Sequence, residues 1–285
     1  MCASFAAGWR GNLAMLQTLT NRRLAQRTVV VAITMVDARI IHGDCLDVLP
    51  TLPEQSVALM FCDLPYGVTA ADWDVQLNLA QIWKEMQRTA KENAAYLFTA
   101  TQPFANAVIN SMPSLFKYDL LWDKAVTAAI GCARHRPLPY HEGIYVFGKR
   151  VLYNPQMVRL KKPNRITAGQ AKGNCPTTGL DRTKLLGKTY THTYPSTILR
   201  FPVREYGRGL HSTQKPLALL RYLIRTYSNP GDTVLDPTCG SGTTLVAALL
   251  EGRHSIGIEK DATIFANARE RVMAVRRSLR PKDNA

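Results

Sequence analysis

Uniformly apolar runs and helical patterns follow one another along most of this chain. Residues 57–62 are all apolar or Cys, which is typical of a strand buried on both faces of a parallel sheet. Further strands are expected at 39–42, 95–100, 118–122, 144–147, 233–236 and 255–259. Helices are expected at 78–92, from Pro103 onward, near 215–227, at 243–250 and at 261–278. Strands that alternate with helices predict an α/β fold, with a mostly parallel twisted sheet and helices on both faces.

The pattern fades between residues 151 and 206. This stretch is rich in Lys, Thr, Gly, Asn and Pro and has few apolar runs. A compact domain rarely holds so long an irregular connection unless the connection has a function. We therefore expect an insertion that serves recognition, with one local strand at 196–201.

Positive charge is concentrated in and around this insertion. The whole chain carries a net charge of +15, and residues 149–225 hold sixteen Lys and Arg against two acids, Asp181 and Glu205. Such a segment favours a polyanionic partner, because each neutralised phosphate releases counterions. A charged surface that only keeps the protein soluble is the alternative. The residues expected to contact such a partner are Lys161, Lys162, Arg165 and Lys172.

The cysteines and the hydropathy narrow the class of protein. None of the six cysteines forms a Cys-x-x-Cys pair, a pattern that favours a reduced, cytoplasmic protein over a disulfide framework. Cys132, His135, His141 and Cys175 lack the paired spacing of zinc ligands, so no metal site is expected. No run of 18 apolar residues exists, and no membrane span is expected.

A glycine-containing turn lies between the strand at 233–236 and the helix at 243–250. Its sequence is Asp236-Pro237-Thr238-Cys239-Gly240-Ser241-Gly242. A strand, a glycine loop and a helix in this order bind adenosyl groups at the carboxyl edge of a parallel sheet. Asp236 can face an ammonium group, and Glu259, which ends the next strand, can accept the hydroxyls of a ribose. Position 245 is Leu, so the Gly-x-Gly-x-x-Gly spacing of NAD enzymes is missing. A tight turn without a ligand is the other interpretation.

A second polar corner, Asp63-Leu64-Pro65-Tyr66-Gly67, follows the apolar run at 57–62. Alone it could be an ordinary turn at the end of a strand. With the glycine loop after it in the chain, it resembles the beta subgroup of the DNA amino-methyltransferases, over roughly residues 38–275. The segment His211-Ser212-Thr213-Gln214-Lys215-Pro216 supports this, since it resembles the His-Pro-Thr-Gln-Lys-Pro of that family. The resemblance implies a Rossmann-like fold with permuted motif order, in which S-adenosylmethionine gives its methyl group to an exocyclic amine of double-stranded DNA.

The resemblance also assigns roles at the Asp63 corner. The carboxylate of Asp63 and the backbone carbonyl of Leu64 accept the two N–H groups of the amine, Pro65 stiffens the turn, and Tyr66 stacks on a base flipped out of the duplex. Cys62, inside the apolar run, is expected to be a packed residue rather than a nucleophile. Residues 134–142 resemble a further family segment that borders the base pocket, where Tyr140 is a candidate second stacking face.

The resemblance also indicates which residues bind the cofactor. Asp44 is expected to touch the adenine amine of the cofactor, and Thr213 and Lys215 its methionine end, with Lys215 facing the carboxylate. The full set expected to bind S-adenosylmethionine is Asp44, Thr213, Lys215, Asp236, Pro237, Cys239, Gly240, Ser241, Gly242 and Glu259.

The chain is expected to consist of five parts. They are a poorly ordered extension at 1–34, a catalytic half at 35–150, a target-recognition insertion at 151–206, a cofactor-binding half at 207–278 and a tail at 279–285. The resemblance suggests a bacterial or phage protein of restriction–modification type and allows a homodimer.

The resemblance makes adenine N6 the expected target. At the first position of the clamp, which here is Asp63-Leu64-Pro65-Tyr66, Asp is commoner among the adenine enzymes of that family and Ser among the cytosine N4 enzymes. Cytosine N4 methylation is the main alternative. Methylation of a protein glutamine, an NAD oxidoreductase and a DNA-binding module with a decayed methyltransferase site are less favoured.

Overall fold

The structure is a computed structural model that describes residues 36–67, 77–127, 130–170, 172–174, 181–203 and 214–279. The predicted extension at 1–34 and nearly all of the tail therefore lie outside the described residues. Within the described ranges, no helix combines the length and the apolar character that crossing a membrane requires.

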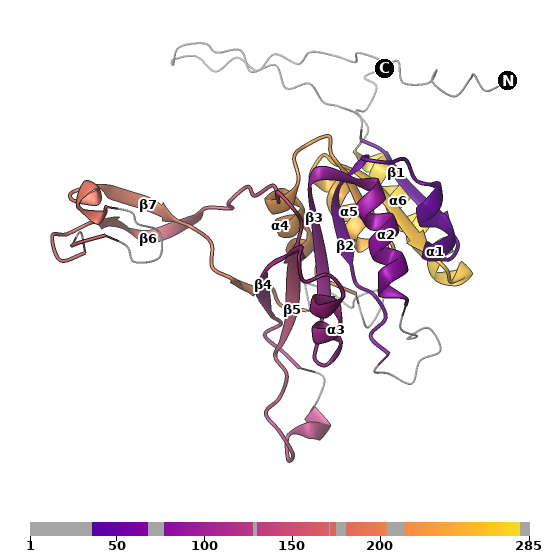
Figure 1. Ribbon diagram of the computed structural model, residues 1–285, viewed down its shortest axis with the longest axis horizontal. Helices are drawn as coiled ribbons and strands as arrows, with labels where there is room; N and C mark the ends of the chain where they lie inside the picture. The colour runs from indigo at the N-terminus through magenta and orange to yellow at the C-terminus, as the bar shows by residue number, and fades with distance from the viewer. Residues whose placement is uncertain are drawn as a thin grey trace, which may run out of the picture. The chain divides into compact units, whose positions relative to one another are not determined.

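The main sheet has eight strands in the order β1-β10-β9-β2-β3-β5-β4-β8 (Figure 1). Their bounds are β1 (Ala38–His42), β2 (Val57–Cys62), β3 (Ala90–Ala100), β4 (Phe116–Asp123), β5 (His141–Phe147), β8 (Ile198–Arg200), β9 (Thr233–Asp236) and β10 (His254–Glu259). β1, β10, β9, β2 and β3 run parallel, β5 is antiparallel to both of its neighbours, and β8 is parallel to β4. The expected mostly parallel sheet is confirmed. One edge consequently gathers the carboxyl ends of β1, β10, β9, β2, β3 and β4 with the amino end of β5.

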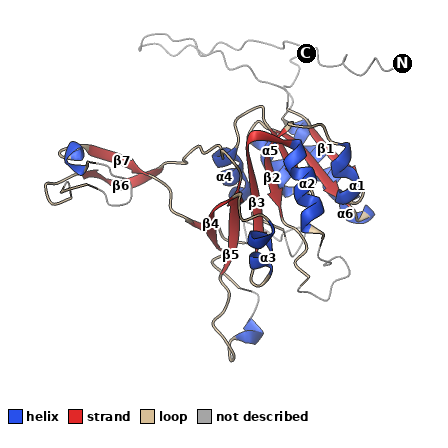
Figure 2. Ribbon diagram, viewed as in Figure 1, coloured by secondary structure: helices blue, strands red, loops and turns tan. Residues whose placement is uncertain are grey.

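Helices cover both faces of this sheet (Figure 2). Their bounds are α1 (Cys45–Val48), α2 (Leu79–Thr89), α3 (Phe104–Ser111), α4 (Leu217–Tyr227), α5 (Thr243–Leu250) and α6 (Ala262–Ser278). All of β2 is buried, as its apolar sequence predicts. Met60 packs in a core with residues of α2 and α3, whereas Leu59 packs in a second core with residues of α4 and α5. The alternation of side chains along a strand thus anchors helices on both faces.

Capping side chains fix where the helices begin. Asn78 accepts a hydrogen bond from the Gln81 amide at the start of α2, and Asp261 accepts from two amides at the start of α6, as expected. α2 ends at Thr89, earlier than the predicted residue 92, because β3 begins at once and Ala90 pairs with Val57 of β2.

The insertion contains more regular structure than its sequence suggests. β6 (Val158–Arg165) and β7 (Thr189–Thr193) form an antiparallel hairpin, and within the described residues these two strands pair only with each other. The expectation of an irregular stretch was wrong here, whereas β8 confirms the local strand predicted at 196–201. Nearly every residue of β6 and β7 is exposed, so neither strand has the apolar alternation that reveals a half-buried strand.

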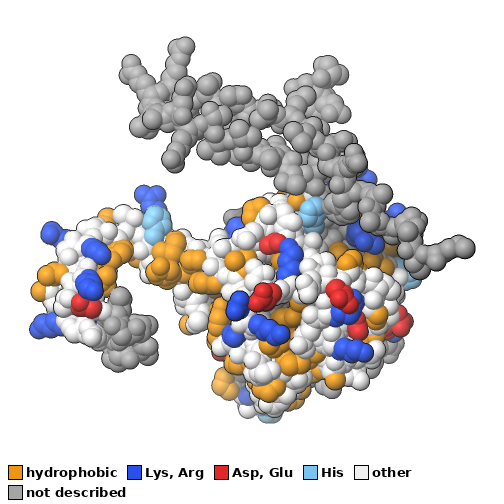
Figure 3. All heavy atoms as spheres, turned by 45° about the horizontal axis from the view of Figure 1, so that its top comes forward, with side chains coloured by type: hydrophobic (Ala, Val, Ile, Leu, Met, Phe, Trp, Pro, Cys, Tyr) orange, Lys and Arg blue, Asp and Glu red, His pale blue; other side chains and the backbone are white. Residues whose placement is uncertain are grey.

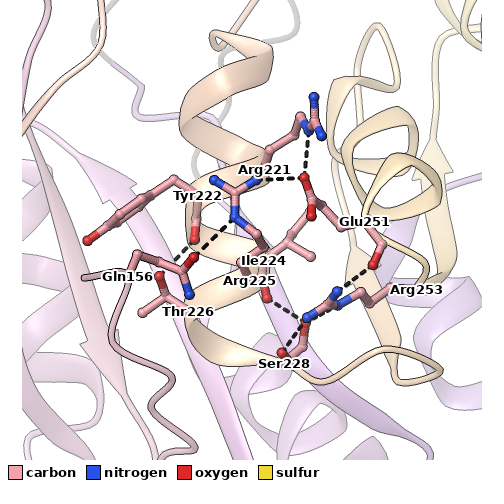
Figure 4. Close-up of polar contacts among 9 residues, drawn as sticks. All are labelled: Gln156, Arg221, Tyr222, Ile224, Arg225, Thr226, Ser228, Glu251 and Arg253. Carbon is pink, nitrogen blue, oxygen red and sulfur yellow. Dashed lines mark hydrogen bonds and ion pairs between the residues drawn. The ribbon is translucent and has the colours of Figure 1, made fainter. Parts of the chain in front are cut away.

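A polar network joins α4, the end of α5 and the start of the insertion (Figure 4). Glu251 Oε1 accepts hydrogen bonds from Arg221 Nε at 2.6 Å and Arg225 Nη1 at 2.7 Å. Arg225 also donates to Gln156, and the buried Arg253 donates to the carbonyl oxygen of Ser228 at 2.7 Å. The carboxylate of Glu251 is therefore shared by two cations that come from successive turns of one helix.

We expect Glu251→Ala to lower the free energy of unfolding by about 1 to 2 kcal/mol. The Glu251 side chain is only 10% exposed, but Arg221 and Arg225 are 41% and 38% exposed, so water screens them when the carboxylate is lost. Urea unfolding measures the change. The matched control is Glu92→Ala, because Glu92 pairs with Arg150 and both side chains are more than 70% exposed. Equal losses in the two variants would contradict a structural role for the network.

Candidate active site

The two predicted corners meet at the carboxyl edge of the sheet. β2 and β9 are neighbours, with Leu59 opposite Val234 and Met60 opposite Leu235. Beyond the strand ends, the Thr238 hydroxyl donates to the backbone oxygen of Asp63 at 3.0 Å. The Asp63 corner and the glycine loop therefore lie side by side. Thr238, for which no role was expected, is the direct link between them.

The carboxylate of Asp63 is held by three side chains from different parts of the chain. Oδ1 accepts from Thr99 Oγ1 at 2.5 Å, from the Tyr66 hydroxyl at 3.2 Å and from Lys215 Nζ at 2.8 Å. Oδ2 lies 2.8 Å from the same Lys215 nitrogen. Thr99 is fully buried on β3, so the carboxylate is oriented before any ligand arrives.

Tyr66 belongs to the same cluster. Its ring stacks on Phe104 with centroids 5.1 Å apart, and its hydroxyl donates to Glu142 Oε1 at 3.0 Å. Burial raises the pKa of Tyr66 well above its usual value, and the charges of Asp63 and Glu142 raise it further. Tyr66 therefore keeps its hydroxyl proton, and this single O–H is shared between the two carboxylates.

Lys215 lies at the Asp63 corner. Its ammonium contacts both Asp63 oxygens and lies 3.1 Å from Glu142 Oε1, and its side chain is only 13% exposed. Burial alone lowers the pKa of Lys215, but the carboxylates of Asp63 and Glu142 outweigh it and raise that pKa above the ordinary lysine value. Lys215 thus contacts two carboxylates of the protein, and its contact with a cofactor carboxylate stays a prediction.

Glu142 was not singled out from the sequence, although residues 134–142 were expected to border the pocket. It is 8% exposed near the amino end of β5 and also lies 3.8 Å from Lys124 Nζ. Tyr140, the residue that had been singled out, is 46% exposed. The antiparallel pairing of β5 brings Glu142 to the edge, and that pairing has no local sequence signal.

The two glycines of the loop have different tasks. Gly240 has φ +50° and Gly242 has φ +74°, both in the left-handed region that favours glycine. A Cβ added at Gly240 would meet open space, whereas one at Gly242 would lie 3.0 Å from a methyl carbon of Val272. Gly240 therefore leaves room for a ligand beside the backbone, and Gly242 lets α5 pack closely on α6.

Three further carboxylates follow neighbouring strands along this edge. Glu259 accepts from the Gly240 amide at 3.0 Å and from the Asp261 amide at 2.8 Å, which fixes its orientation. Asp44 caps α1 and pairs with Lys260 at 2.9 Å, a contact that lowers the pKa of Asp44. Asp236 is the third.

Asp236 is the most buried of these acids, with 3% of its surface exposed. It accepts a hydrogen bond from the Thr238 amide at 3.1 Å. Burial raises the pKa of Asp236 to about 7, against the hydrogen bonds of Thr244 and Thr238, and the charges of Asp63 and Glu259 add to the shift. A cationic group placed beside this carboxyl would favour its ionised form.

Two other residues predicted to bind the cofactor, Cys239 and Ser241, contact neighbouring parts of the protein. The Cys239 side chain is 7% exposed and packs with Leu245 and Val272, and Ser241 is hydrogen bonded to Thr243 and Arg271. The backbone of this loop can still face a ligand. Thr213 lies outside the described residues. The buried Cys62 contacts Met86, in agreement with a packed role.

The expected DNA-binding residues are exposed. Lys161, Lys162 and Arg165 lie on β6, and Lys172 lies in the short described stretch 172–174. Figure 3 shows blue Lys and Arg side chains spread over this hairpin. Its register shifts between Arg159 and Asn164, so β6 has extra residues opposite β7, and both lysines fall in that irregularity.

Comparison with known proteins places the site in a family context. A family model described as DNA methylase matches residues 57–270. The chain is 29% identical over 248 residues to DNA adenine methyltransferase YhdJ of Escherichia coli K12, with 77% of each chain covered. It is 28% identical over 248 residues to type II methyltransferase M1.MboII of Moraxella bovis, with 80% of this chain and 94% of the relative covered.

Solved structures share the fold. The M1.HpyAVI–SAM complex superposes with a TM-score of 0.55 at 20% identity, covering 82% of this chain and 99% of the other. The cytosine-N4-specific PvuII DNA methyltransferase superposes with a TM-score of 0.58 at 16% identity, covering 86% and 93%. These likenesses extend across both halves of the sheet.

We expect Asp236→Asn to stabilise the protein at pH 8 relative to wild type. A neutral Asp236 favours the folded state at low pH, and this contribution is lost as the pH rises from 3.8, the unfolded value, through about 7. The loss reaches up to about 4 kcal/mol at high pH, and an amide does not suffer it.

Thermal unfolding from pH 5 to pH 8 tests this expectation. The stability difference between Asp236→Asn and wild type should grow with pH. Asp119→Asn, which alters an exposed carboxylate on β4, should show no such trend. A pH-independent difference for Asp236→Asn would mean that Asp236 is already ionised in the folded protein.

Proposed function

This chain belongs to the DNA methylase family, and we propose that it transfers a methyl group from S-adenosylmethionine to the N6 amine of adenine in double-stranded DNA. The proposal includes the roles of the individual site residues and the use of residues 151–206 as a target-recognition element.

One observation carries the proposal: the hydrogen bond between Thr238 and the backbone of Asp63. It joins the corner suited to hold an amine to the loop suited to hold an adenosyl group. Methyl transfer needs these two ligands in contact, and fixed proximity is one of the largest sources of rate enhancement.

The glycine loop fits S-adenosylmethionine. Gly240 has open space beside its backbone, the Glu259 carboxylate is fixed where ribose hydroxyls need an acceptor, and buried Asp236 suits an ammonium group. Asp44 is suited to accept from the adenine amine, because one of its oxygens caps a helix and leaves acceptor capacity. When bound, the cofactor supplies an electrophilic methyl group, which the amine takes with loss of one proton.

The protein's own task is to prepare the amine. The lone pair of an exocyclic amine is delocalised into its ring, so the nitrogen must be drawn toward tetrahedral geometry. Two acceptors achieve this, and the carboxylate of Asp63 and the carbonyl of Leu64 are suited to the task. A base must leave the duplex to reach them, which costs a few kcal/mol, and stacking on an aromatic residue such as Tyr66 returns part of that cost.

Two observations favour adenine. The clamp begins with Asp, and the relative from Escherichia coli is named a DNA adenine methyltransferase. A decayed site is disfavoured, because Asp63, Tyr66, Gly240 and Glu259 are all present and joined by hydrogen bonds to other parts of the edge.

Expression in a methylation-free host should leave N6-methyladenine in the host DNA. Single-molecule sequencing gives the target sequence, and mass spectrometry of digested nucleosides gives the modified atom. N4-methylcytosine alone would overturn the adenine assignment. We expect Asp63→Ala to abolish the product while the affinity for labelled S-adenosylmethionine stays nearly unchanged.

The matched control for Asp63→Ala is Asp232→Ala. Asp232 is also ion-paired and partly buried, but it precedes β9, at the opposite end of the strand from the site. This variant should keep full methylation. If Asp63→Ala loses cofactor binding together with activity, Asp63 has a structural role instead.

Replacement of Lys161 and Lys162 by uncharged residues should weaken the affinity for DNA by about tenfold, and by the same factor for all DNA sequences. If both lysines contact phosphates, the slope of log affinity against log salt should become shallower by about 2. Fluorescence anisotropy at several salt concentrations measures both quantities.

The control is a variant without Lys84 and Arg269, which are exposed residues on α2 and α6. It loses the same charge from outside the insertion and should keep the wild-type slope. An unchanged slope after removal of Lys161 and Lys162 would exclude these residues from phosphate contact.

A further inference from the structure

The ammonium of Lys215 occupies an unusual position for a lysine. It lies 2.8 Å from each Asp63 oxygen and 3.1 Å from Glu142 Oε1, inside the clamp that the amine must enter. The ring of Trp122 lies below it, 5.9 Å from the nitrogen. A buried cation beside the amine acceptor has no role in the chemistry described so far.

An amine-bearing base presents two neighbouring groups at its pairing edge. In adenine the N6 amine donates and the adjacent ring nitrogen N1 accepts, and cytosine has the same order at N4 and N3. Guanine and thymine carry a carbonyl and a ring N–H in the corresponding positions, which reverses donor and acceptor. A site that places an acceptor beside a donor therefore matches adenine and cytosine and rejects the other two.

Asp63 and Lys215 provide such a pair. The carboxylate can only accept and the ammonium can only donate, and the two are held at contact distance. We propose that Lys215 donates a hydrogen bond to the ring nitrogen beside the target amine, so that Asp63 and Lys215 together recognise the amine-bearing edge of the flipped base. This inference rests on the proposed function.

The hydrogen-bonding capacity of Lys215 allows this contact. An ammonium group has three N–H donors, and the three nearby oxygens belong to only two carboxylates. When the amine engages Asp63, one N–H can turn to the base while Glu142 keeps the ammonium in place. Glu142 is thus a positioning residue. Lys124 lies on the far oxygen of Glu142 and has no contact with Asp63, so it does not share this task.

A second role would explain the same contacts: Lys215 could serve only to orient Asp63. The two roles differ in a measurable way. A lysine that only orients Asp63 affects methylation of every base equally, whereas a lysine that reads the ring nitrogen matters only when that nitrogen is present.

The experiment compares adenine with 1-deazaadenine, in which a C–H group replaces N1, at the target position of a duplex. Single-turnover rates under saturating enzyme report the step after binding. For the wild-type enzyme we expect the analogue to react at least about tenfold more slowly, since a hydrogen bond to a charged group is lost. The analogue pairs more weakly in the duplex, which eases flipping and so works against the expected loss.

Lys215→Met supplies the decisive comparison. It should slow adenine methylation and bring the ratio of the two substrates to within about threefold, because the selective donor is gone. Lys124→Met should keep the wild-type ratio. Equal rates on both substrates with the wild-type enzyme would overturn the inference without any variant. A Lys215→Met enzyme that is slower yet keeps the wild-type ratio would also overturn it and would leave only the orienting role.

A failure of the proposed function gives different results from a failure of the inference about Lys215. A wild-type enzyme that makes N4-methylcytosine instead would end the adenine assignment, and 3-deazacytosine would then test Lys215 in the same way. Absence of any methylated base in the host DNA would contradict the proposed function itself.

Discussion

The parallel pairing of β2 with β9 is the constraint on which the rest of this molecule depends. It places the turn after Cys62 beside the turn after Asp236, although roughly 170 residues of chain separate them. Closing so long a loop costs conformational entropy, but the cost grows only slowly with length. Burial of both faces of β2, against α2 and α3 on one side and α4 and α5 on the other, offsets it. The Asp63 corner and the glycine loop are thus neighbours because the core requires their strands to be neighbours.

The carboxylates at this edge of the sheet lie in two kinds of surroundings. Asp63 and Glu142 share Lys215, so their charges are compensated within the protein. Asp236 has no ion pair among the described residues, and burial raises its pKa to about 7. A compensated carboxylate keeps one geometry, which suits a group that must aim an amine. An uncompensated one gains most from a cationic ligand, which suits a binding group. Under the proposed function, the same residue type therefore serves two tasks because its surroundings differ.

Sequence patterns predicted those elements whose bounds depend on nearby residues. The uniformly apolar β2, the short β9 and the helix α5 were predicted with the bounds that the structure has, because burial on both faces and a glycine turn leave clear signals. The β6–β7 hairpin was missed because exposure on both faces erases alternation. Thr99 and Glu142 were missed because β3 and β5 bring them to Asp63 through nonlocal pairing. Lys215 was found by resemblance, but its partners became visible only in three dimensions.

Under the proposed function, recognition of DNA is divided between two surfaces. The β6–β7 hairpin carries exposed Lys and Arg, pairs only with itself within the described residues, and contributes little to the core. A two-stranded ribbon fits the major groove of DNA, and its cations suit phosphates, whose contacts depend strongly on salt. Under the same proposal, the partly buried edge around Asp63 and Lys215 meets one flipped base at a time, and partly buried charges are screened less by salt than exposed ones. The proposal thus implies that changes in the hairpin alter which DNA is bound without disturbing the choice of amine, because the hydrogen bonds that hold Asp63 come from β3, the turn after β2 and Lys215 rather than from the insertion.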